Sequence, residues 1–167
     1  VHALLALNLA LAAPAMAQTQ VRKLAIVVGN NAGSGELAPL RYAEADAGKM
    51  ARVLVELSDV APDDLMLLQG RGVADLERAF QVVRERSAGA TSTVLVFYFS
   101  GHSDGESLEL GKDAVSFTQL RALLDGSKAT VRLAIIDACS TGSGLRMRGG
   151  KPSAAFSIRA NDALNTR

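Results

Sequence analysis

The sequence predicts an α/β fold in three layers, with a mainly parallel sheet flanked by helices on both faces. Arg22 to Gly29, which is apolar after its two basic residues, and the run Thr93 to Phe99 have the composition of strands buried on both faces. Apolar residues recur at helical spacing from Leu40 to Leu57 and from Val73 to Arg86, between these runs. Strands that alternate with helices in this way form a parallel sheet.

Shorter segments complete the predicted order of elements. Leu65 to Leu68 is expected to form a short strand, and Val131 to Ile136 a further buried strand. Leu108 to Ser116 fits a small hairpin, and Phe117 to Leu124 fits a short helix. Between the strongest strand and this hairpin, Ser100 to Ser107 is expected to be a polar loop.

Length and composition indicate one compact domain and exclude some partners. The chain has 167 residues, 49% hydrophobic and 21% charged, which is typical of a packed core rather than of disorder. A net charge of +1 provides no electrostatic attraction for nucleic acid or an anionic membrane. With 4% aromatic residues and no Trp, a platform for stacking bases is not expected either. The sequence therefore predicts no nucleic-acid partner.

The two ends of the chain are expected to lie outside the domain, which spans residues 21–142. Residues 1–17 have the form of a secretory signal, because the apolar run Ala3 to Ala13 is followed by the small-x-small site Ala15-Met16-Ala17. The run is too short to span a bilayer, so we expect cleavage after Ala17, export to the periplasm or the exterior, and no stable membrane anchor afterwards. Residues 143–167 begin as a Gly-rich basic linker and are too short for a domain.

Reactive side chains gather at the predicted strand ends, where parallel sheets bind ligands. Ser100-Gly101-His102 follows one buried strand, and Asp137-Ala138-Cys139 follows another. If these strands are neighbours, their ends lie about 5 Å apart. Imidazole can take the proton of a thiol, and backbone N–H groups of Gly101 and Cys139 could hold an oxyanion. The sequence therefore predicts Cys139 as a nucleophile with His102 as its base.

Two other glycine patterns point to different chemistry and lack the context that it needs. Gly33 to Ala38 matches G-x-G-x-x-A, but Pro39 falls where the helix of a dinucleotide site should run. Gly101 to Gly105 matches the G-x-S-x-G elbow of α/β-hydrolases, which requires a histidine after the nucleophile. Both histidines of the chain precede Ser103. A serine hydrolase that uses Ser103 is therefore kept only as a lesser alternative.

Three motifs together resemble those of the caspase and metacaspase clan. Tyr98-Phe99-Ser100-Gly101-His102-Ser103 resembles the histidine motif, and Asp137-Ala138-Cys139-Ser140-Thr141-Gly142 resembles the cysteine motif. Leu40-Arg41-Tyr42-Ala43-Glu44-Ala45-Asp46-Ala47 is similar to the segment that opens the first helix in metacaspases and bacterial caspase-like proteins. The resemblance runs from about Arg22 to Gly142. It implies a caspase-like fold and a cysteine endopeptidase that acts on proteins or peptides by a Cys-His dyad.

The resemblance also implies which part of a caspase-like catalytic domain this sequence covers. The family normally continues past the cysteine with a small-subunit portion. We therefore expect residues 21–142 to be the large-subunit part of a caspase-like catalytic domain. Residues 143–167 are then the linker and a truncated start of the remaining portion.

The motifs depart from those of animal caspases at residues that bind substrate. Animal caspases carry Gln where this chain has Asp137, and Arg where it has Leu40. Asp137 lies two residues before Cys139 and is expected to project to the same side of its strand. The resemblance gives Asp46 the position of an acidic pocket residue of metacaspases. Two carboxylates would bind a guanidinium or ammonium group, so the expected cleavage is after Arg or Lys.

Other roles for these carboxylates, and for the chain, remain alternatives. Asp46 could cap its helix, and Asp137 could hold loop amides. The main alternative function is a catalytically inactive caspase-like interaction module, or an incomplete fragment. No cofactor or metal is predicted, since Asp104, Glu106 and Asp113 lack a metal-ligand spacing and fit a solvated loop. Activation by calcium, which many metacaspases show, and the oligomeric state are left open.

Overall fold

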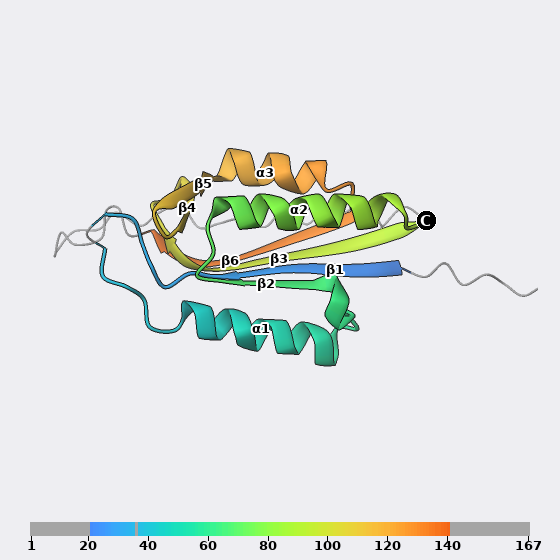
Figure 1. Ribbon diagram of the computed structural model, residues 1–167, viewed down its shortest axis with the longest axis horizontal. Helices are drawn as coiled ribbons and strands as arrows, with labels where there is room; N and C mark the ends of the chain where they lie inside the picture. The colour runs from blue at the N-terminus through green and yellow to red at the C-terminus, as the bar shows by residue number, and fades with distance from the viewer. Residues whose placement is uncertain (1–20, 36, 141–167) are drawn as a thin grey trace, which may run out of the picture.

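The computed structural model of the chain describes residues 21–35 and 37–140 (Figure 1). The predicted signal segment 1–17 and the predicted linker 143–167 lie outside the described residues. In chain order the elements are β1 (Val21–Gly29), α1 (Ala43–Leu57), a 3-10 turn (Pro62–Asp64), β2 (Leu65–Gln69), α2 (Val73–Ala88), β3 (Ser92–Ser103), β4 (Ser107–Leu110), β5 (Asp113–Ser116), α3 (Phe117–Gly126) and β6 (Val131–Ser140). None of the helices in these residues is long and apolar enough to cross a membrane.

The sheet is mixed and mostly parallel, as the sequence predicts. β1 pairs with β2 on one side and with β3 on the other, and β3 also pairs with β6, all in parallel. The β4–β5 hairpin is antiparallel and joins the end of β3 at the pair Ser103↔Leu108. Helix α1 covers one face of the sheet, and α2 and α3 cover the other (Figure 1). The predicted three-layer α/β/α arrangement is confirmed.

Alternation along the strands divides the core into two apolar layers. In β1, Leu24, Ile26 and Val28 pack under α2 and α3, whereas Ala25 and Val27 pack under α1. In β3, Phe97 belongs to the first layer, where its ring stacks on Phe80 with a centroid distance of 5.9 Å. Tyr98 belongs to the layer under α1. The same alternation places the even-numbered residues that follow Tyr98 on the face of α1.

The end of β3 differs from the sequence prediction, and the difference concerns the candidate site. The polar loop expected from Ser100 is wrong, because β3 continues to Ser103 and β6 continues beside it to Ser140. Ser, Gly and His have little intrinsic preference for strands, so their strand state follows from pairing with β6. At the end of β3, pairing with a neighbouring strand therefore determines the backbone state more than local composition does.

Helix α1 begins three residues later than its apolar spacing suggests. Leu40 is bound outside the helix, where its N–H donates to the carbonyl oxygen of Asn31 over 2.7 Å. The first turn of the helix is closed by the N–H of Asp46, which donates to the carbonyl of Tyr42. The segment from Leu40 to Tyr42 thus precedes the helix, with bends at Arg41 and Tyr42, and does not form its first turn.

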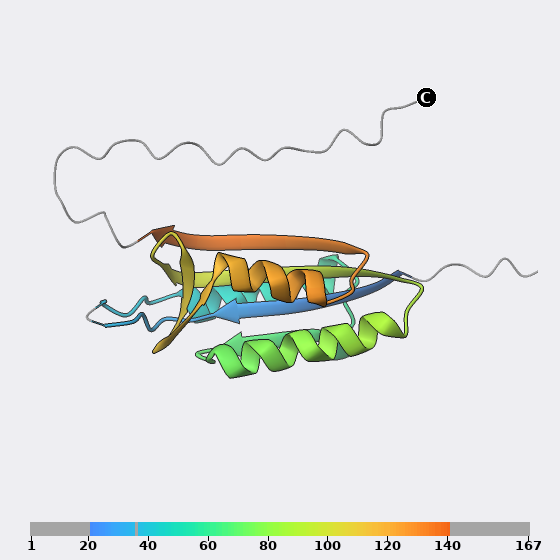
Figure 2. The same ribbon diagram turned by 90° about the horizontal axis from the view of Figure 1, so that it is seen from above.

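β6 is an edge strand in the described part of the chain (Figure 2). It pairs with β3 along its whole length, and no described strand pairs with its other side. Several of its apolar side chains are exposed, with Val131 at 53% and Leu133 at 50%. The strand that carries Cys139 is therefore held from one side only within these residues.

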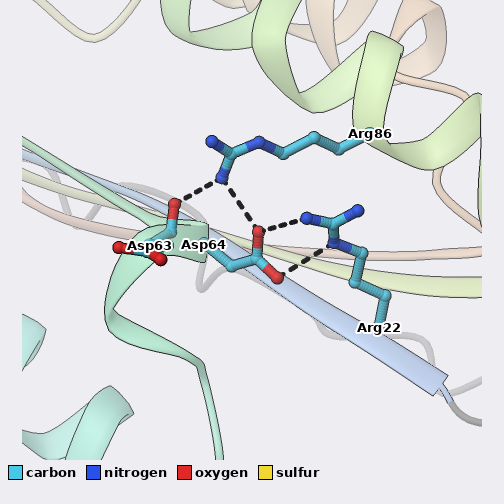
Figure 3. A network of polar contacts seen from close by, with 4 residues as sticks. All are labelled: Arg22, Asp63, Asp64 and Arg86. Atoms are coloured by element: carbon cyan, nitrogen blue, oxygen red, sulfur yellow. Dashed lines mark hydrogen bonds and ion pairs between the residues drawn. The ribbon is translucent and has the colours of Figure 1, made fainter.

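A charged cluster ties the start of β1 to the start of β2 and the end of α2 (Figure 3). The Arg22 guanidinium donates two hydrogen bonds to the carboxylate of Asp64, at 2.9 and 2.7 Å. Arg86 donates to the same carboxylate over 2.9 Å and also to the backbone carbonyl of Asp63. Asp64 is buried, and the hydrogen bond from Arg22 is the main reason that its pKa is lowered. The bidentate geometry is the stronger kind of ion pair.

We expect Asp64→Asn to lower the free energy of unfolding by about 1–3 kcal/mol at neutral pH, because two guanidinium groups lose their charged acceptor. A carboxyl group with a lowered pKa in the folded state stabilises it above the unfolded pKa, near 4, and loses this effect as the pH falls through the folded value. The difference from wild type should therefore shrink in acid. Denaturant melts at pH 7 and pH 3 measure it. Asp59→Asn, at an exposed pair with Lys23, is the matched control and should change little.

Candidate active site

The parallel pairing of β3 with β6 brings the two predicted catalytic residues to neighbouring positions. Their backbones are in register, with Gly101 opposite Ala138 and His102 opposite Cys139. Adjacent strands lie about 4.8 Å apart, so the condition on which the sequence prediction depended is met at the level of the backbone. Both residues lie within strands and not in the loops that were expected to follow them.

The imidazole of His102 is buried and has no structural partner in the described residues. The residue is 4% exposed. Neither Nδ1 nor Nε2 has a hydrogen-bond partner among the described residues, although both atoms are buried. A buried polar atom without a partner costs about 1–3 kcal/mol, so a histidine kept in this state is unusual for a purely structural role. Both nitrogens therefore keep unused hydrogen-bonding capacity within the described residues.

A small hollow opens beside His102 and contains both carboxylates that the sequence assigned to substrate binding. Its volume is about 230 Å³. Asp46 reaches it from the first turn of α1, and Asp137 reaches it from β6. The wall is completed by Leu40, Arg41, Tyr42, Ala43, Ser100, Gly101, His102 and Ala138. The structure thus brings together the predicted base and both predicted substrate-binding residues, which come from three separate elements.

Tyr98 contacts Asp137, which lines this hollow, and the sequence analysis assigned its side chain no role of its own. Its hydroxyl donates to Oδ2 of Asp137 over 3.4 Å. The pKa of Tyr98 is raised, mainly by burial and further by the negative charges of Asp137 and Asp46. The sequence signal that could have indicated this role is the position of Tyr98, four residues before His102 and thus on the same face of β3. The contact engages Oδ2 of Asp137, and no hydrogen bond among the described residues engages Oδ1.

Positive groups compete for the acidic pair. Lys49 donates to Oδ1 of Asp46 over 2.8 Å, as a partly exposed i,i+3 pair on α1. Arg41, to which the sequence analysis gave no role, lines the hollow. An exposed pair of this kind is worth less than about 1 kcal/mol, so a substrate cation can displace Lys49. Asp137 is exposed and accepts only the Tyr98 hydroxyl among the described contacts.

Gly101 is needed for packing at this point of β3. A Cβ on it would lie 2.6 Å from the ring of Phe99 and 3.2 Å from the carbonyl oxygen of Asn30. An added side chain would therefore have to displace the ring of Phe99, which is fully buried in the core. The requirement for glycine is explained without a substrate, and the oxyanion role of the Gly101 and Cys139 N–H groups stays a prediction.

The local structure around Ser103 and Asp104 differs from that of a nucleophile elbow. Ser103 donates to the carbonyl of Ser107 over 2.7 Å and accepts from the N–H of Gly105, so it closes the turn between β3 and β4. A hairpin follows it, whereas a nucleophile elbow leads into a helix. Asp104 accepts the N–H groups of Glu106 and Ser107, and these bonds lower its pKa. In the described part of the chain, no cluster of three or more His, Cys, Asp or Glu residues could hold a metal ion.

Comparison with known proteins agrees with this geometry. The family model of the caspase domain matches residues 22–164. The chain belongs to the caspase domain family. The structure of pro-sf-caspase-1 is similar to it with a TM-score of 0.57 at 15% sequence identity, covering 98% of this chain and 63% of that chain. No curated protein matches the chain significantly. At 15% identity the likeness shows the fold, and this caspase domain spans less than two thirds of the solved relative.

Titration of Tyr98 tests its contact with Asp137 without an assay of activity. In a Tyr42→Phe background, the only remaining phenol of this caspase domain is Tyr98. We expect it to ionise above the ordinary pKa of about 10, because burial and two carboxylates disfavour the phenolate. Asp137→Asn should lower that value by removing a negative charge. Ultraviolet absorbance followed with pH measures both, and circular dichroism checks that the fold persists. A normal pKa in the background variant would contradict the contact.

Proposed function

We propose that this chain carries the catalytic part of a cysteine endopeptidase. The observation that supports it most is the register of β3 and β6, which pairs His102 with Cys139 inside a caspase domain. A thiol at its ordinary pKa near 8.5 is mostly protonated at neutral pH and needs a base close by. His102 is the only histidine between residues 21 and 140, and Cys139 is the only cysteine of the chain. Neither has a substitute.

In the proposed reaction, His102 takes the proton of the Cys139 thiol, and the thiolate attacks the carbon of the scissile carbonyl. The oxygen becomes an oxyanion, which the N–H groups of Gly101 and Cys139 would hold. The imidazolium then returns its proton to the leaving amine as the C–N bond breaks, and a thioester remains on Cys139. Water, deprotonated by His102, hydrolyses the thioester and restores the thiol.

The hollow beside His102 is proposed to receive the side chain that precedes the cleaved bond. Asp46 and Asp137 line it, and a cation placed there would gain both carboxylates. Arg is favoured over Lys because its planar fork can engage two acceptors at once. Arg41, at the same wall, would oppose a substrate cation if its side chain turned inward. The proposed specificity is therefore cleavage after Arg or Lys.

Substitution of the dyad tests the reaction itself. We expect Cys139→Ala and His102→Ala each to lower kcat/KM of the full-length protein by about 1,000-fold or more, because nucleophile and base act as one unit. Ser103→Ala is the control, since it removes the hydroxyl on which a serine hydrolase would depend. Activity that survives in Cys139→Ala but disappears in Ser103→Ala would overturn the proposal. A thiol-directed alkylating probe that fails to label Cys139 in the folded protein would favour an inactive interaction module.

A panel of fluorogenic peptides that differ only in the residue before the cleaved bond tests the specificity. We expect Arg to be preferred over Lys, and Asp to be rejected by the acidic hollow. Asp46→Asn and Asp137→Asn should each lower the preference for Arg over an uncharged residue by about 10-fold or more, as a charge-assisted hydrogen bond is lost. Asp75→Asn, on the opposite face of the sheet, is the matched control. A preference for Asp would instead assign Arg41 as the residue that reads the substrate.

A further inference from the structure

The loop between β1 and α1 packs against the imidazole of His102. A Cβ on Gly33 would lie only 2.8 Å from Cδ2 of that ring. Gly33 does not have a positive φ, so its backbone does not require glycine. The reason for glycine here is the close approach of the loop to the ring. The same Cβ would touch Leu37 at 3.0 Å, but Leu37 belongs to the loop and can shift with it, whereas His102 is fixed in the sheet.

A buried carboxylate on the hairpin holds this loop in place. Glu109 in β4 is 5% exposed, and its Oε2 accepts the N–H of Ser34 over 2.7 Å. Taking a carboxylate out of water is costly unless it gains hydrogen bonds, so its presence at a buried hairpin position calls for a specific use. The bond it makes is to the residue directly after Gly33, across 75 positions of sequence. Glu109 therefore fixes the loop at the point where it meets the ring.

The other side of Gly33 is fixed as well. The N–H of Asn30 donates to the carbonyl of Ser100, two residues before His102, over 3.0 Å. The Asn30 side chain accepts the N–H of Ala32 over 3.0 Å. Asn31 and Glu44 exchange backbone-to-side-chain hydrogen bonds, which attach the loop to the first turn of α1. Gly33 is thus held between anchors on β3, α1 and β4.

We propose that Gly33 and Glu109 are positioning residues for His102, and that the loop orients the imidazole by contact. A catalytic histidine is commonly oriented by a third group that accepts one of its N–H protons. Among the described residues no such group bonds either nitrogen of His102. The packed edge of the ring against Gly33 takes that role here, and the Glu109–Ser34 bond makes the contact rigid. The inference rests on the proposed function only in treating His102 as the base.

The test combines a readout of the ring with one of catalysis, in the full-length protein. The variants are Gly33→Ala, which inserts a methyl group against the ring, and Glu109→Leu, which removes the anchor. Glu109→Gln keeps an acceptor oxygen and is the conservative rescue. Gly126→Ala is the matched control, because a Cβ there meets nothing within 4 Å. Ring signals are read by NMR in a His2→Ala background, where the resonances of His102 are the only histidine signals of this chain.

We expect Gly33→Ala and Glu109→Leu to shift or broaden the His102 ring signals and to lower kcat on the order of 10- to 100-fold, with KM changed less than about threefold. Glu109→Gln and Gly126→Ala should keep wild-type ring signals and rates. Unchanged ring signals in Gly33→Ala would overturn the inference, and this variant decides even if Glu109→Leu does not fold. A wild-type protein without peptidase activity would refute the proposed function, while the NMR comparison would still test the positioning.

Discussion

The parallel ladder between β3 and β6 is the constraint on which the candidate site depends. It joins ten successive residue pairs, from Val94↔Val131 to Ser103↔Ser140, and the last few pairs carry the chemistry. β1 ends at the pair Gly29↔Ser100, so β3 and β6 run on past it as a narrow extension of the sheet. The end of β1 leaves room for its loop to fold over His102 and for α1 to begin beside Asp137. A shift of one residue in this ladder would turn its side chains to the opposite faces.

The electrostatics of the hollow follow from the same geometry. Asp137 enters from β6 and Asp46 from α1, and the buried phenol of Tyr98 supports the first while Lys49 partly neutralises the second. Neither carboxylate is deeply buried, so water reaches both of them. A cationic side chain would find its partners already placed, which reduces the ordering that binding requires. A side chain bound by Asp46 would have to replace its pair with Lys49.

The architecture could be predicted from the sequence more completely than the candidate site could. Buried runs such as Leu24 to Val28 and amphipathic spacing in α1 and α2 report burial directly, so the layers and most strands could be predicted. The reactive residues could be located because they follow these runs. The strand state of Ser100 to Ser103 could not, since it arises from pairing with a segment almost forty residues away. The same holds for Tyr98, Arg41 and Glu109, whose roles are defined only by which neighbours the fold brings to them.

The central place of β3 in the sheet gives the strand of His102 a high local stability. The strand of His102 is central, with β1 on one side and β6 on the other, and its neighbours on both faces are buried. The strand of Cys139 has a ladder on one side only within the described residues, and its apolar side chains are partly in water. A strand with ladders on both sides, such as β3, opens only at a free energy near that of global unfolding. Backbone amides of β3 around His102 should therefore be among the last in these residues to exchange with deuterium.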